Sequence, residues 1–214
     1  MQNFRNKMSN ISFISFRNQF FKYGCFSTSQ VLMWNNRFDN NNYTRWEKQG
    51  LIVRLRRGWF AFPEYLKVPE FQRHIAGRIY RPSYISLHHA LAYYGIIPEA
   101  VMNITNITTL KTASFQNKFG NFTYQTIQAA LFFGFDIKTL QQGATYAIAT
   151  PEKALLDLLY LYPIYNTETE MLDLRLDEAF LREELNLERF KEYKQRFGKA
   201  VNKRADILFK AYGL

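Results

Sequence analysis

Hydrophobic positions near the start of the chain recur at helical intervals. Residues 11–23 predict a first helix, which Gly24 ends. A second helix is expected to begin at Ser27, because Ser27 and Gln30 match a capping box in which each side chain satisfies an orphan backbone donor. The polar stretch that follows leads into a third helix over residues 41–49. Three short helices are therefore expected at the start of the chain.

The third predicted helix has one apolar and one polar side. Tyr43 and Trp46 are three residues apart, so both are expected to face inward. The side chains expected to face outward are Asn41, Thr44, Arg45 and Lys48. Arginine and asparagine suit bidentate contacts with guanine and adenine, so this outward side is a candidate for reading base edges in a major groove.

A two-stranded ribbon follows the third helix. Residues 52–55 and 59–62 read as strands, and Arg56-Arg57-Gly58 is the turn between them. Helix, turn, helix and ribbon in this order predict a winged helix-turn-helix. The wing arginines expected to contact phosphates or the minor groove are Arg54, Arg56 and Arg57.

The rest of the chain mixes helical and strand-like patterns. A linker is expected at residues 67–69, with helices over 69–80 and 84–94. Strands are expected where β-branched or alternating apolar residues occur, over 104–109, 122–127, 135–140 and 146–149. Thr150-Pro151-Glu152 combines a cap, a first-turn proline and an acid, which predicts a helix start.

These patterns predict an α+β fold with two domains. An N-terminal winged helix-turn-helix over residues 1–66 precedes a mixed sheet-and-helix domain over 67–214. The second domain ends in a helical C-terminal tail from about residue 167.

Basic charge is concentrated in the first of these domains. Residues 1–62 carry ten Lys and Arg against two Asp and Glu, a net charge of +8, whereas the whole chain carries +10. A basic excess confined to one small module indicates a polyanionic partner, here double-stranded operator DNA. The other interpretation is that the winged helix docks a protein and that its arginines are a solvated face.

Few features suggest redox chemistry, export or a membrane. Cys25 is the only cysteine, so no intramolecular disulfide forms, and a buried apolar role is expected for it. The apolar patch 11–21 is interrupted by polar residues and lacks a cleavage site, which argues against a signal peptide. The run 154–162 is far short of a membrane span. A cytoplasmic, nucleoid-associated protein without a cofactor is expected.

Candidate metal and catalytic groups have ordinary structural explanations. His88 and His89 are adjacent, and helical neighbours diverge by about 100°, so they do not form a metal-binding pair. His74 is distant in sequence. Four carboxylates of the tail suggest scattered nuclease pairs, but i,i+4 pairing with arginines explains them; they are Glu168, Glu170, Asp173 and Asp177.

No catalytic constellation is visible. Glu152 and Asp157 are five residues apart and so do not share a helix face, and Glu152 is expected to serve the helix dipole. There is no nucleophile elbow, no phosphate-cradling glycine-rich loop and no nucleotidyltransferase signature. The sequence predicts neither an enzyme site nor a metal site.

Several segments together suggest a family. They are Leu51 to Phe60, Tyr84 to Gly95, the Thr-rich strand 104–109, Phe132-Phe133-Gly134 and Ala149-Thr150-Pro151-Glu152-Lys153-Ala154-Leu155-Leu156-Asp157. With these segments, residues 15 to about 165 resemble the AbiEi-type antitoxins and transcriptional regulators of bacterial abortive-infection (type IV) toxin–antitoxin systems. The last segment is the most specific part of the resemblance.

The resemblance implies two activities. The winged helix would bind an operator and repress its own operon, and the rest of the chain would counter a nucleotidyltransferase-type toxin, with no stable complex required. Two other functions stay open. One is a stand-alone transcription factor whose second domain senses a ligand or dimerises, including a homodimer on the DNA. The other is an enzyme with a DNA-docking arm.

Overall fold

The computed structural model describes residues 11–141 and 143–214. Arg5 and Lys7, which contribute to the basic charge of the N-terminal segment, lie outside the described residues. The chain has an α+β fold with two separate sheets.

The chain divides into two compact units. Unit 1 holds the residues up to Phe71 together with 115–119, and unit 2 holds 72–114 and 120–214. The predicted boundary between residues 66 and 67 falls within a 3₁₀-helix of unit 1, η2 (Pro63–Lys67).

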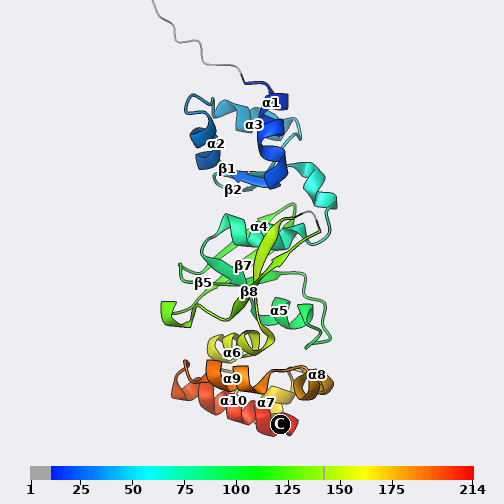
Figure 1. Ribbon diagram of the computed structural model, residues 1–214, viewed down its shortest axis with the longest axis vertical. Helices are drawn as coiled ribbons and strands as arrows, with labels where there is room; N and C mark the ends of the chain where they lie inside the picture. Colours follow the sequence, from blue (N-terminus) through cyan, green and yellow to red (C-terminus); the bar gives the residue numbers. More distant parts are fainter. Residues whose placement is uncertain (1–10, 142) are drawn as a thin grey trace, which may run out of the picture. The chain divides into compact units, whose positions relative to one another are not determined.

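Unit 1 combines helices with a three-stranded antiparallel sheet (Figure 1). Its remaining elements are α1 (Phe13–Phe20), η1 (Phe21–Tyr23), β1 (Cys25–Ser27), α2 (Thr28–Trp34), α3 (Asn41–Lys48), β2 (Val53–Arg56) and β3 (Trp59–Ala61). The strand order is β1-β3-β2. The short strand β1 was not expected from the sequence; it forms because residues 25–27 pair with β3.

The local signals at the start of α2 are confirmed. Ser27 Oγ accepts from the Gln30 backbone nitrogen at 3.2 Å, and Gln30 Oε1 accepts from the Ser27 nitrogen at 2.8 Å, which completes the capping box. Cys25 is fully buried. Aromatic rings from α1, α3, the sheet and the segments beside them form the core of unit 1; they are Phe16, Phe20, Phe26, Phe38, Tyr43, Trp46, Phe60 and Phe62.

Unit 2 is a mixed six-stranded sheet with helices on both faces. Its strands are β4 (Ser83–Ile85), β5 (Ile104–Thr108), β6 (Ala113–Asn117), β7 (Gly120–Thr126), β8 (Phe135–Thr139) and β9 (Thr145–Ala149). They lie in the order β6-β7-β5-β4-β9-β8. β4 pairs antiparallel with β5 and parallel with β9, and β8 pairs antiparallel with β9 at the edge.

Two layers of helices flank this sheet (Figure 1). α4 (Phe71–Ile79) covers one face, where the Tyr124 hydroxyl donates to the Ala76 carbonyl at 2.8 Å. α5 (Leu87–Tyr93) and α6 (Pro151–Leu161) lie on the other face. The tail packs beneath α6 as α7 (Glu168–Leu172), α8 (Glu178–Glu183), α9 (Leu187–Lys194) and α10 (Lys199–Tyr212).

One predicted helix was wrong at its start. The sequence predicts a helix over 84–94, but Tyr84 and Ile85 belong to β4 and only Leu87–Tyr93 is helical. Both side chains are buried because β4 is an inner strand with helices on each face, and such a run has no alternation to distinguish it from a helix. The helix expected from Pro69 starts instead at Phe71.

The other sequence signals of unit 2 gave the correct element types. Strands occur at the four predicted places, and β6 is an additional strand that was not expected. α6 begins after Thr150, whose Oγ1 accepts from the Lys153 nitrogen at 3.4 Å. Among the described residues, no helix is long and apolar enough to cross a membrane.

Candidate nucleic-acid interface and a buried polar cluster

The outward side of α3 is a continuous polar stripe. Asn41, Thr44, Arg45 and Lys48 are all exposed, at positions i, i+3, i+4 and i+7 of one helix. Tyr43 and Trp46 are buried on the opposite side, where the Tyr43 ring stacks on Phe60 with centroids 4.8 Å apart. The aromatic core therefore fixes which face of this short helix is available to a partner.

The Arg45 side chain is held along this stripe. Its Nη2 donates to Asn42 Oδ1 at 2.6 Å, and Asn42 is itself buried. This bond uses one donor of the exposed Arg45 guanidinium, which carries five, and a bidentate contact with a base needs two.

The β2–β3 hairpin presents Arg57 at its tip. Arg57 and Gly58 form the turn, and Gly58 has φ +76°, a conformation that favours glycine. The Gly58 carbonyl accepts from the Thr28 nitrogen at 2.9 Å, so the turn is attached to the first residue of α2. The tip of the hairpin is consequently fixed relative to the helices of unit 1.

The other two wing arginines already have protein partners. Arg54 donates to Glu47 of α3, with Nη2 and Oε2 2.6 Å apart, and it also lies over the Phe60 ring. The Arg56 guanidinium lies 4.9 Å from the ring centroid of Phe115, within the same unit. A phosphate contact by either side chain stays a prediction, and it requires competition with these contacts.

A hollow of about 330 Å³ lies between α2, α3 and the hairpin. The predicted residues Thr44, Arg54 and Arg57 all line it. Thr28 and Asn40 also line it. The sequence singled out neither, because each precedes or begins a helix and is read there as a cap or first-turn residue.

Tyr43 is a lining residue of this hollow with a buried hydroxyl. Its side chain is 5% exposed, and its hydroxyl has no hydrogen-bond partner in the part of the chain that the structure describes. Burial raises the pKa of Tyr43 well above its ordinary value. The hydroxyl therefore stays protonated at neutral pH.

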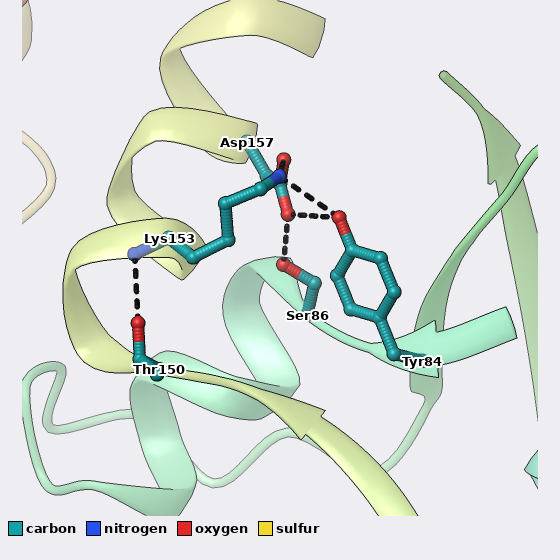
Figure 2. Close-up of polar contacts among 5 residues, drawn as sticks. All are labelled: Tyr84, Ser86, Thr150, Lys153 and Asp157. Carbon is teal, nitrogen blue, oxygen red and sulfur yellow. Dashed lines mark hydrogen bonds and ion pairs between the residues drawn. The ribbon is translucent and has the colours of Figure 1, made fainter. Parts of the chain in front are cut away.

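Unit 2 contains a buried polar cluster, which Figure 2 shows. The Lys153 ammonium forms an ion pair with Asp157 one helical turn further along α6, and both side chains are fully buried. Asp157 Oδ2 accepts from the Tyr84 hydroxyl at 3.0 Å and from the Ser86 hydroxyl at 2.8 Å. Lys153 Nζ also donates to the Tyr84 oxygen at 2.9 Å.

Burial and pairing act in opposite directions on these groups. Burial lowers the pKa of Lys153 and raises the pKa of Asp157, whereas the attraction between the two and their hydrogen bonds oppose both shifts. Burial beside Asp157 raises the pKa of the Tyr84 hydroxyl. Because these groups are closed off from solvent, the cluster holds β4 against α6 and has no access to a substrate.

Three segments of the family resemblance meet at this cluster. Tyr84 and Ser86 come from one, Lys153 and Asp157 from another, and Gly134 from the Phe132-Phe133-Gly134 segment. Gly134 has φ +70°, and a Cβ there would lie 3.1 Å from the Lys153 Cγ. Its carbonyl accepts from the Thr150 nitrogen at 2.9 Å. The most specific part of the resemblance is thus a packing motif.

Several carboxylates of α6 and the tail have structural partners. Glu152 is buried, and its Oε1 accepts from the Asn186 nitrogen at 3.0 Å, just before α9. Glu170 completes a capping box with Thr167, and Asp177 caps α8. The prediction of i,i+4 pairing was wrong for Glu168, which pairs with Lys210 of α10, because the tail helices pack against one another.

The histidines are divided between separate contacts. His74 Nδ1 lies 2.7 Å from the Thr145 carbonyl oxygen, and Arg73 Nε donates to His89 Nε2 at 3.4 Å. Burial lowers the pKa of His88. Within residues 11–141 and 143–214, no group of three or more His, Cys, Asp or Glu could hold a metal ion.

Comparisons of the sequence with models of known protein families and with curated proteins found no match.

Proposed function

We propose that this protein is a DNA-binding transcriptional autorepressor and the antitoxin of a type IV toxin–antitoxin system. In this proposal unit 1 is a winged helix-turn-helix that binds operator DNA. The observation that carries the DNA-binding part is the polar stripe of α3 beside the exposed Arg57, presented by a fixed aromatic core.

The order of elements in unit 1 supports this proposal. Helices α2 and α3 are followed directly by the β2–β3 hairpin, and β1 joins the hairpin in the order β1-β3-β2. A B-DNA major groove is about 12 Å wide and admits one helix. With α3 in that groove, Asn41 and Arg45 reach base edges, while Arg57 at the hairpin tip contacts phosphates.

The charge of unit 1 supports the same partner. Residues 11–62 carry eight Lys and Arg against two Asp and Glu, and one of those acids, Glu47, pairs with Arg54. The stripe and the hairpin tip carry Arg45, Lys48 and Arg57, and the carboxylate nearest to them in α3, Glu47, pairs with Arg54. Binding of a nucleic acid to such a face is favoured, because each phosphate that is neutralised releases a condensed counterion.

Fluorescence anisotropy of the full chain with labelled duplexes tests DNA binding. The duplexes are the region upstream of its own reading frame and a shuffled control of the same length. Contact with about five phosphates predicts that log K falls with log salt with a slope of about −4 to −5. Salt-independent binding, or equal absence of binding to all upstream fragments, contradicts the proposal.

The wing can be tested separately from the helix. Replacing Arg57 by alanine should weaken binding to cognate and shuffled duplexes alike and reduce the salt slope by about one unit. The Arg56→Ala variant is the comparison, because Arg56 already lies over Phe115 and is expected to change the slope less. A larger effect at Arg56 would show that its contact with Phe115 is lost on DNA.

The antitoxin part of the proposal rests on the family resemblance. Its test expresses a candidate nucleotidyltransferase toxin from an unrelated promoter, so that repression cannot protect the cell. The full chain carrying Arg45→Ala and Arg57→Ala should still restore growth, because unit 2 would act on the toxin or its product. Loss of protection in that variant would mean that the protein acts only through DNA.

A specific observation favours a second candidate function. Unit 2 contains a hollow of about 440 Å³, within the range of about 300–1,000 Å³ that small-molecule sites occupy. A stand-alone transcription factor with a ligand-sensing second domain would use such a site. DNA affinity that changes on adding a small molecule, in the absence of any neighbouring toxin gene, would favour this function.

A further inference from the structure

The hollow of about 440 Å³ is built within unit 2, from the end of α4, the chain that follows it and the β8–β9 edge. Phe135, Ile137, Ala147 and Thr145 line it from one face of the β8–β9 pair, where Ile137 lies opposite Ala147. Phe132 joins them from the segment before β8. One wall is therefore mainly apolar and aromatic.

The hollow also has basic residues in its lining. Arg78 and Arg81 both line it, and Arg81 is exposed. None of the described lining residues is an aspartate or glutamate. Two guanidinium groups beside a flat apolar surface match a ligand that has an anionic group at one end and a planar ring at the other.

The aromatic wall is fixed from behind by the buried cluster. The Tyr84 ring stacks on Phe135 with centroids 4.8 Å apart and meets Phe132 edge-on at 5.0 Å. The Tyr84 hydroxyl is in turn held by Lys153 and Asp157 (Figure 2). The site is thus preformed, which lowers the entropy lost when a ligand binds.

One exposed apolar side chain on the edge strand points to the same site. Ile137 is 64% exposed although it lies in a strand and lines the hollow. A ligand ring placed between Ile137 and the two phenylalanines would remove this apolar surface from water. A single small molecule with an anionic group and a planar ring would match both the arginines and the apolar residues of the hollow.

We infer that this hollow binds a mononucleotide, with the base against Phe132 and Phe135 and the phosphate on Arg78 and Arg81. The inference deepens the ligand-sensing alternative, and it does not depend on DNA binding by unit 1. Guanidinium groups recognise phosphate through parallel N–H···O bonds, and phenylalanine faces accept any of the four bases by stacking.

Isothermal titration calorimetry of the full chain tests the inference. The titrants are AMP, GMP, CMP and UMP, with adenosine and inorganic phosphate as half-ligands. We expect at least one nucleotide to bind once per chain and more tightly than either half-ligand. If no nucleotide binds, or if inorganic phosphate binds as tightly as the nucleotides, the inference is overturned.

Two exposed substitutions locate the site without disturbing the core. Arg81→Ala should weaken nucleotide binding about tenfold or more, because it removes a charge-assisted contact. Ile137→Glu should abolish binding, because it replaces the apolar side chain that packs on the base with a carboxylate, which also repels the anionic nucleotide. The matched control is Lys203→Ala, which removes one exposed positive charge of unit 2 outside the hollow and should leave the affinity unchanged. Circular dichroism verifies that each variant is folded.

A further variant separates this site from the basic face of unit 1. The chain with Arg45→Ala and Arg57→Ala should lose DNA affinity and keep its nucleotide affinity. If it loses nucleotide binding while Arg81→Ala keeps it, the nucleotide binds unit 1 and the inference is wrong. If the unsubstituted chain binds a nucleotide but no DNA, the result contradicts the proposed function alone and leaves the nucleotide site standing.

Discussion

Unit 1 and unit 2 each contain an ion pair, and the two pairs lie in opposite surroundings. The side chains of Arg54 and Glu47 are 43% and 34% exposed. Those of Lys153 and Asp157 are both 0% exposed. In an exposed ion pair, water, salt ions or another anion can readily replace one partner. In a buried ion pair, only neighbouring protein groups are within reach.

The comparison extends to the rest of each unit. Unit 1 places its charges around an aromatic core and turns them to solvent, and its largest buried groups are rings. Unit 2 takes Glu152, Lys153 and Asp157 of a single helix into its interior. Charge in unit 1 is therefore available to a partner, and charge in α6 serves the fold. The following predictions test this division.

The largest effect is expected at the buried pair. Lys153→Met leaves Asp157 buried with only hydroxyl partners, which should lower the free energy of unfolding by about 3–5 kcal/mol. Urea unfolding followed by circular dichroism measures this loss. The three tryptophans lie at positions 34, 46 and 59, all in unit 1, so the midpoint from tryptophan fluorescence should fall less.

A double variant provides the control for that prediction. Lys153→Met combined with Asp157→Leu removes both charges, and most of the lost stability should return, since apolar replacements of buried pairs are often neutral. If the double variant is less stable than the single one, or if Lys153→Met loses under about 1 kcal/mol, the pair is not a structural element of unit 2.

An effect of intermediate size is expected on the outward face of α3. Arg45→Ala should weaken binding to the cognate duplex by about 1–3 kcal/mol and reduce discrimination against shuffled DNA. Its effect on stability should stay within about 1.5 kcal/mol, because the side chain is exposed and its hydrogen bond to Asn42 is lost. Lys22→Ala removes an exposed charge of the same unit away from α3 and should change neither. If Arg45→Ala lowers the affinity for the cognate and the shuffled duplex equally, Arg45 contacts a phosphate and does not read a base.

The Tyr43 hydroxyl gives a pH-dependent test inside unit 1. Burial raises its pKa in the folded state, so its stabilising contribution is complete below pH 10 and is lost as the pH rises above that value. Between about pH 10 and 11, this residue should lower stability by up to about 1.4 kcal/mol. Tyr43→Phe should match the parent chain at neutral pH and be more stable than it at about pH 11. If Tyr43→Phe and the parent chain have equal midpoints of urea unfolding at about pH 11, the raised pKa of Tyr43 is contradicted.

These contrasts also show which features the sequence could predict. The capping box at Ser27, the start of α6 at Thr150 and the outward stripe of α3 depend on residues within one or two helical turns. Such short-range signals do not need the rest of the fold. The stripe was visible because Tyr43 and Trp46 mark the opposite side of the same helix.

Features that depend on distant residues were not predicted. Lys153 follows Thr150-Pro151-Glu152 and reads as a first-turn residue, and its burial requires Tyr84 and Ser86 from another part of the chain. β4 becomes a strand because β5 and β9 lie beside it. The hollow of unit 2 likewise joins residues before β4 to the β8–β9 edge, so no sequence window contains it.

The smallest effect is expected at the exposed pair, which is the counterpart of Lys153–Asp157. Glu47→Gln removes the charge that holds Arg54 but keeps the shape of the side chain. Since exposed pairs contribute about 0.2–1 kcal/mol, stability should change by no more than that. Affinity for DNA should rise in the same variant, because Arg54 becomes available to a phosphate and a carboxylate leaves the basic face. The salt slope should steepen by about one unit as one more phosphate is neutralised.

Anisotropy at several salt concentrations measures this change, and Glu64→Gln is the matched control, because Glu64 pairs with Arg17 away from α3 and the hairpin. A loss of DNA affinity in Glu47→Gln would mean that the pair positions Arg54 for binding. In that case the exposed ion pair of unit 1 would be structural in the same sense as the buried pair of unit 2.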